Sequence, residues 1–157
     1  MIRWIALLML VCVASSFVDG QPTRQPDSVS AAKSSSPRFS YVDVYLDAKS
    51  ESLAAYQFEF ASERGHITVV GIEGGEHPAF AKRPPYYDPA ALRQNRVIVA
   101  AFSTDSELPK GKTRIARVHL LIEGESPHYA VKIVVAANSA GRTIAGATVS
   151  ILEGAKP

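Results

Sequence analysis

The chain has 157 residues, which is the length of one domain with flanking segments. Its 17 Lys and Arg residues against 15 Asp and Glu residues give a formal net charge of +2, mixed along the sequence. A charge this small gives no electrostatic reason to expect a nucleic acid or an anionic membrane surface as a partner.

The first 20 residues have the pattern of a secretory signal peptide. Arg3 supplies a positive charge, and an unbroken apolar run follows from Ile5 to Val13. This run is shorter than the roughly 20 apolar residues that a membrane-spanning helix needs. Small residues then lead to a cleavage site before Gln21. We expect a secreted, periplasmic or cell-envelope protein with no other membrane segment; an uncleaved N-terminal anchor is the alternative.

Removal of residues 1–20 would also remove chemistry from the chain. The single Cys, the single Trp and both Met residues lie in this leader. The remaining chain therefore has no thiol for a nucleophile, a disulfide or a thiolate metal site. Residues 21–37 are rich in Ser, Pro, Gln and Ala, which predicts a flexible linker ahead of the domain.

Residues 38–154 form the expected domain, because apolar and polar residues alternate there as in strands with one buried face. Turn signals recur at intervals near ten residues, and no amphipathic helix of useful length is visible. We expect seven to nine strands in a single antiparallel β-sandwich. The clearest strands are predicted at 39–47, 54–60, 67–72, 97–103, 114–123, 129–135 and 144–152.

Turns are expected between several of these strands. Arg64-Gly65 and the segment 124–127 are each predicted to turn the chain, and residues 139–142 to close a hairpin into the last strand. The segment 74–96 is mostly loop because it contains four prolines. Within it, Asp88 and Pro89 predict one helical turn, with Asp88 as the N-cap.

The same loop carries the most unusual composition in the chain. Its aromatic and cationic residues are Phe80, Lys82, Arg83, Tyr86 and Tyr87. A stiff aromatic loop suits partner binding because it loses little entropy on contact. The alternative is that Phe80 and one tyrosine tuck under the loop and close the open end of the sandwich. If the loop binds, replacing its three aromatics with Ala weakens binding and leaves the melting curve intact.

The sequence offers no catalytic arrangement. It has no Gly-x-Ser-x-Gly elbow, no phosphate-binding Gly-rich loop and no His-Glu-x-x-His pair. The four histidines lie on separate predicted elements without the spacing of metal ligands. Asp43 and Asp47 are roughly 13 Å apart along a strand, which exceeds the separation used in glycoside hydrolysis. We interpret them as solvated charges, and expect no enzyme, metal or cofactor.

Several segments resemble cohesin-type domains. The similar segments are Val42–Leu46, Leu53–Phe60, Val97–Ser103 and Thr113–Ile122, within a resemblance that runs from about Phe39 to Ile151. The resemblance implies a nine-strand jelly-roll sandwich, a fold that cohesins share with cellulose-binding modules. It also implies docking of a protein partner, such as a dockerin-like module with its own calcium, on one sheet face.

Two binding functions follow from this resemblance. The first is a protein-interaction module for an extracellular or periplasmic partner. The second is a polysaccharide-binding module, for which Tyr41 and Tyr45 on one strand face, or Tyr86 and Tyr87 in the loop, form a weak aromatic strip. The ordinary strand propensity of tyrosine is the alternative explanation of the Tyr41 and Tyr45 pair. We expect the protein partner.

Overall fold

The computed structural model describes residues 36–154. The expected leader, nearly all of the linker and the cleavage site lie outside this range, so their assignments stay predictions. Within the described range, no helix has the length and apolar character needed to cross a membrane.

The domain is an all-β structure, as predicted. Its strands form one antiparallel sheet of six strands in the order β3-β4-β2-β5-β1-β6. The elements in chain order are β1 (Arg38–Asp47), β2 (Leu53–Glu73), α1 (Pro78–Ala81), β3 (Tyr86–Tyr87), the 3-10 helix η1 (Pro89–Arg93), β4 (Arg96–Phe102), β5 (Lys112–Asn138) and β6 (Thr148–Glu153).

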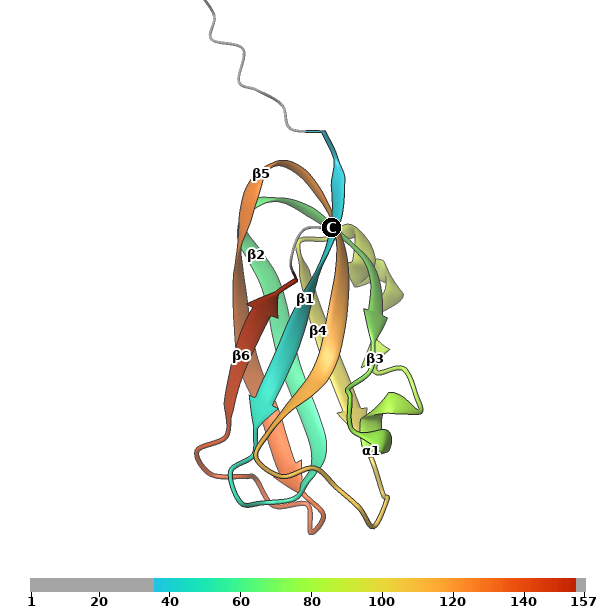
Figure 1. Cartoon of the computed structure of the whole chain (residues 1–157), viewed down its shortest axis with the longest axis vertical. Helices are drawn as coiled ribbons and strands as arrows, with labels where there is room; N and C mark the ends of the chain where they lie inside the picture. Colours follow the sequence, from blue (N-terminus) through green and yellow to red (C-terminus); the bar gives the residue numbers. More distant parts are fainter. Residues whose placement is uncertain (1–35, 155–157) are drawn as a thin grey trace, which may run out of the picture. The chain divides into compact units, whose positions relative to one another are not determined.

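The strand count is lower than expected because two pairs of predicted strands are continuous. β2 has 21 residues and β5 has 27. The two strands pair with each other along both of their halves, and both bend near residues 62–66 of β2 and 123–128 of β5, which we call the arch. Figure 1 shows β2 and β5 curving over together at this end. The predicted chain reversals at residues 64–65 and 124–127 are therefore wrong.

The arch depends on close contact between the two strands. Gly65 has φ +81°, and a Cβ atom at this position would lie 2.8 Å from the Cα of Pro127. Only glycine adopts this conformation without strain and leaves room for the facing backbone. The ladder shifts register on both sides of Arg64, as expected where bulges bend a strand pair. Gly65 thus bends a strand where the sequence indicated a turn.

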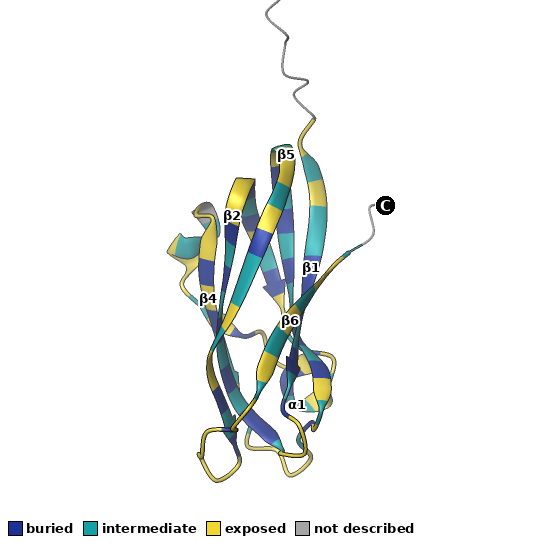
Figure 2. Ribbon diagram, turned by 90° about the vertical axis from the view of Figure 1, so that its left-hand side faces the viewer, coloured by how far each residue is buried: buried dark blue, intermediate teal, exposed yellow. Residues whose placement is uncertain are grey.

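The two halves of β2 and β5 have different outer neighbours. The first half of β2 pairs with β4, and the first half of β5 pairs with β1. Residues from both halves of these strands belong to one cluster of buried side chains. The Tyr56 hydroxyl of β2 donates a hydrogen bond of 2.7 Å to the carbonyl oxygen of Ile115 in β5, although these residues are far apart in the ladder. Figure 2 shows buried and exposed residues alternating along the strands.

The C-terminal part differs from the predicted hairpin. A turn does form, with the Gly141 N–H donating to the carbonyl of Asn138. The following residues make only one bridge back to β5, between Ala137 and Thr143. β6 instead crosses to β1 and pairs with it from Val42↔Glu153 to Asp47↔Thr148. The last strand, β6, therefore lies beside the first strand, β1.

Because two core tyrosines have raised pKa values, we expect the domain to lose stability at high pH. Burial raises the pKa of Tyr56. Burial is the main cause that raises the pKa of Tyr129, to about 12. The negative charge of Glu153 also raises this pKa, and the positive charge of Arg38 lowers it. A folded-state pKa above the unfolded value of about 10 stabilises the fold fully below pH 10, and this contribution is lost as the pH rises toward 12.

We therefore expect the free energy of unfolding to fall between about pH 10 and pH 12. Urea titrations across this range, with tyrosinate absorbance recorded in parallel, measure the effect. Tyr129→Phe should flatten the pH dependence. An identical profile for the variant would show that Tyr129 ionises in the folded domain as freely as in the unfolded chain.

Candidate functional site

One outer sheet face collects exposed apolar side chains. Along β4, Val97 and Val99 point into the core, so Ile98, Ala100 and Phe102 point outward. The ladder places outward-facing residues of β3, β2 and β5 beside them. We call this surface the β4 face; its residues are Ala55, Gln57, Glu59, Tyr86, Ile98, Ala100, Phe102 and Val135.

Two aromatic rings dominate the β4 face. Tyr86 is 66% exposed and Phe102 is 61% exposed. Their ring centroids are 6.3 Å apart and their planes are parallel to within 4°. Small residues surround them, since Tyr86 lies opposite Ala100 and Phe102 opposite Ala55 in the ladder. Because these neighbouring side chains are short, the two rings project from the sheet and a partner can reach them.

The β4 face has shallow hollows at its two ends. At the η1 end, a hollow of about 340 Å³ is lined by Asp88, Ala91, Gln94, Arg96 and Ile98. At the α1 end, hollows of about 30 and 80 Å³ share the residues Ala79, Arg83 and Phe102. The two hollows beside the rings are small and open, unlike the cavities of several hundred Å³ that enclose small ligands. The surface suits a macromolecule.

The predicted loop site divides between core and surface. Phe80 is only 3% exposed, and its ring meets the ring of Tyr56 edge-on at 5.1 Å between centroids. Tyr87 packs partly buried against the core, whereas Lys82, Arg83 and Tyr86 are exposed. Phe80 is thus part of the core in this structure, where a partner does not reach it. The alternative in which Phe80 and one tyrosine tuck under the loop describes this arrangement.

Two glycines allow the loop to close in this way. A Cβ atom on Gly75 would lie 2.7 Å from the carbonyl oxygen of Arg114, and one on Gly74 would overlap the carbonyl oxygen of Phe80. The ring nitrogen Nδ1 of His77 accepts a hydrogen bond of 3.2 Å from the Ala79 N–H and caps α1. The backbone therefore packs tightly here and fixes Phe80 beneath the loop.

At the other end of the loop, the prediction of a helical turn is confirmed. Asp88 accepts a hydrogen bond of 2.9 Å from the Ala90 N–H, and Pro89 occupies the first position of η1. Tyr86 lies just before this cap, in β3. The loop thus places Tyr86 beside Phe102, which was not among the predicted site residues. Its outward position at the end of a strand was the only available signal.

The second predicted strip, Tyr41 and Tyr45, is covered by cations. The Arg117 guanidinium lies 4.1 Å from the centroid of the Tyr41 ring, and Gly154 packs against this ring so closely that a Cβ atom would overlap it. The Lys112 ammonium lies 5.1 Å from the centroid of the Tyr45 ring. Neither ring offers a free face comparable with that of Tyr86.

Asp43 is buried, so its interpretation as a solvated charge is wrong. It is 6% exposed and accepts two hydrogen bonds from Arg117, of 2.7 Å from Nε and 2.9 Å from Nη2. This bidentate pair raises the pKa of Arg117 further above its usual value. Asp47 pairs with Lys49 at 2.8 Å, and this hydrogen bond lowers the pKa of Asp47.

Removing the cation from this pair should destabilise the domain. Arg117→Met removes both hydrogen bonds of the buried Asp43 carboxylate and leaves it only the more distant Arg114, whose Nε lies 3.9 Å from Oδ1. We expect a loss of about 2 to 3 kcal/mol in the free energy of unfolding. Adding Asp43→Asn to this variant should restore part of the lost free energy of unfolding. A double-mutant cycle by urea denaturation measures this recovery. Equal stabilities of the single and double variants would show that Arg114 alone compensates the buried Asp43 charge.

The remaining histidines each meet one glutamate across neighbouring strands. His119 lies 2.8 Å from Glu73, and His128 lies 2.9 Å from Glu63. His66 is 3.7 Å from Glu123. Each pair supplies two ligand groups where a zinc site uses three or four, and no larger group of such side chains converges within residues 36–154. The expectation that the chain is not an enzyme stays a prediction.

No protein-family model, curated protein or solved structure matches this chain. The resemblance to cohesin-type domains therefore stays a prediction, and the β4 face is interpreted from its own geometry.

Proposed function

We propose that this chain is an exported, non-catalytic binding module that docks a protein partner on the β4 face. We further propose that its folded sheet is a β-sandwich of the cohesin type. The observation that carries the docking proposal is the exposed, parallel pair of Tyr86 and Phe102 on a surface lined by small residues.

The composition of the β4 face supports a protein partner. Aromatic residues are enriched at protein interfaces because each buries a large area with few rotatable bonds. Within residues 36–154, eight large hydrophobic residues are exposed. Four of them, Tyr86, Ile98, Phe102 and Val135, lie on the β4 face. A gathering of exposed apolar side chains on one face is typical of interaction sites.

The arrangement of the ends is consistent with docking. Figure 1 shows the start of β1 at the arch and α1 toward the opposite end of the sheet. Gly154 hydrogen-bonds to Tyr41 of β1, so both described ends of the chain are together. The aromatic pair lies at the α1 end, since Phe102 ends β4 and lines the hollows beside α1. A partner would therefore approach away from the two ends of the described range.

The test is binding by the full chain, expressed with its leader and purified from the secreted or periplasmic fraction. Secreted proteins of the producing cell and insoluble polysaccharides serve as ligands, with and without calcium. The Tyr86→Ala/Phe102→Ala variant should lose at least about tenfold in affinity for the captured protein, because central aromatic anchors carry most interface energy. Leu152→Ala, which removes a 58% exposed apolar side chain on β6, is the matched control.

Retention of the partner by the Tyr86→Ala/Phe102→Ala variant would show that the β4 face is not the docking surface. A polysaccharide-binding module is the second candidate, and the parallel arrangement of the two rings favours it, since ring faces of sugars stack on aromatic side chains. Retention on a polysaccharide, lost in the same variant and without any protein ligand, would establish this second function in place of the first.

A further inference from the structure

The α1 end of the β4 face carries an unpaired cation beside the aromatic pair. Arg83 lines both small hollows that border Phe102, and one of them also contains Tyr86. The Arg83 side chain is exposed and has no hydrogen-bond or ion-pair partner within the described chain. A guanidinium next to aromatic rings therefore faces solvent with all of its donors free.

The neighbouring charges do not cancel Arg83. Lys82 is 3.9 Å from Asp105, and both side chains are well exposed, so these two charges largely offset one another. At the other end of β4, Arg96 donates a hydrogen bond of 2.6 Å to Glu59 and lowers the pKa of that carboxyl group. Lys132 of β5 lies opposite Glu59 and shares this carboxylate with Arg96. Beside the two exposed rings, by contrast, Arg83 is a cation without a carboxylate partner within the described chain.

We infer that the partner presents an acidic segment with an aromatic or other large apolar residue, seated on Tyr86 and Phe102 with its carboxylate on Arg83. This inference rests on the proposed function and names the chemistry of the partner. A carboxylate accepts two parallel hydrogen bonds from one guanidinium, which fixes its orientation. The apolar residue of the partner would cover the rings and remove them from water.

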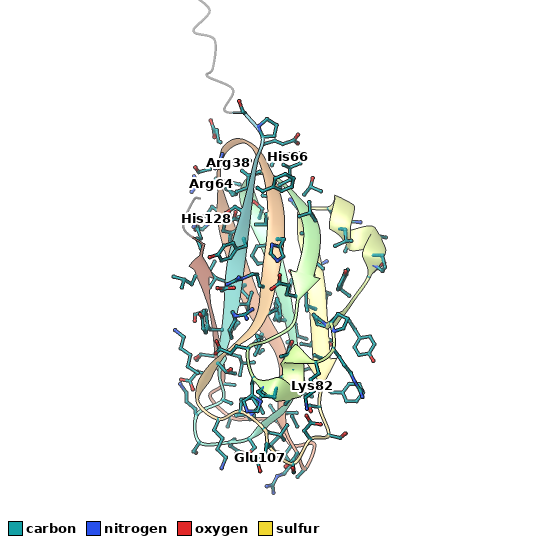
Figure 3. All side chains as sticks on the ribbon, turned by 45° about the vertical axis from the view of Figure 1, so that its right-hand side comes forward. Arg38, Arg64, His66, Lys82, Glu107 and His128 are labelled. Atoms are coloured by element: carbon teal, nitrogen blue, oxygen red, sulfur yellow. The ribbon has the colours of Figure 1, made fainter. Side chains whose placement is uncertain are left out.

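Lys82 adds a second contact that Asp105 controls. Freed from Asp105, the Lys82 ammonium would face the same acidic segment. Figure 3 shows Lys82 beside α1 and Arg64 at the arch, at opposite ends of the domain. Arg64 is likewise exposed, so it provides a charge control that leaves the aromatic end untouched.

The experiment measures binding of the full chain to three polypeptides: a glutamate–tyrosine copolymer, polyglutamate and a lysine–tyrosine copolymer. The glutamate–tyrosine copolymer should bind about tenfold more tightly than either of the others, because it alone offers both charge and ring. Arg83→Glu should weaken its binding about tenfold, and Asp105→Asn should strengthen it about threefold. Arg64→Glu should change it less than twofold, and all variants should keep the wild-type melting curve.

Four results would overturn the inference. Equal losses of affinity for Arg83→Glu and Arg64→Glu would mean that the copolymer binds through the overall charge of the domain. Tighter binding of polygalacturonate, dependent on Arg83, would assign the site to an acidic polysaccharide. A protein partner that Tyr86→Ala/Phe102→Ala releases but Arg83→Glu retains would leave the docking face in place and reject its acidic ligand. Retention by both variants would instead reject the docking face itself.

Discussion

Replacing Gly65 with Ala should destabilise the domain by about 3 to 5 kcal/mol, the sum of a positive-φ penalty and an overpacked contact. The φ angle of +81° is unfavourable for any residue with a Cβ atom. The new methyl group would also lie 2.8 Å from the Cα of Pro127. Because the neighbouring atom is backbone, relief requires the two strands of the arch to separate.

Urea denaturation of wild type and variant measures this loss. Gly141→Ala is the matched control, since Gly141 has a similar φ of +74° but open space where the Cβ atom would be. The control should lose only about 1 kcal/mol, the conformational cost alone. Equal losses for the two variants would mean that the contact with Pro127 relaxes freely and that the arch does not depend on close approach.

Replacing Phe80 with Ala should cost about 3 to 5 kcal/mol, as usual for a large buried aromatic side chain. The ring is 3% exposed and packs edge-on against Tyr56, so its removal leaves a cavity at the loop end of the core. Consequently the Ala variant of all three loop aromatics should unfold at a lower temperature, contrary to the expectation for a loop that only binds.

The matched control is Tyr86→Ala in the same loop. Tyr86 is 66% exposed, so we expect a change of about 0.5 kcal/mol or less. Thermal and urea melts of the two variants separate the loop residue that stabilises from the one available for contact. A Tyr86 variant as unstable as the Phe80 variant would mean that the Tyr86–Phe102 pair contributes to folding, which would weaken the docking proposal.

The positions of most strands could be predicted from the sequence because alternation with period two reports which residues face the core. The continuity of β2 could not. A glycine after a polar residue allows a tight turn and also a bend within a strand, and local sequence does not distinguish them. The choice depends on Pro127 and its neighbours in β5, which lie about sixty residues later in the chain.

The candidate site was predictable in part for a similar reason. The composition of the loop identified Tyr86, Lys82 and Arg83, but whether Phe80 points inward depends on packing against Tyr56. Phe102 faces outward like many strand residues that bind nothing. Its proposed role follows only from the position of Tyr86, which β3 places beside it. Asp43 looked solvated because its partner, Arg117, is 74 residues away.

The pairing of β6 with β1 has a mechanical consequence. The residues nearest the two ends, Val42 and Glu153, form one end of this antiparallel pair, and the Gly154 N–H bonds to Tyr41 just beyond them. Tension applied through the two ends would reach this bond first and then each ladder bond in succession. The hydrogen bonds would open one at a time, like a zipper, instead of sharing the load in shear. A domain pulled this way yields at low force, whereas tension between one end and a partner on the β4 face would follow a different path through the sheet.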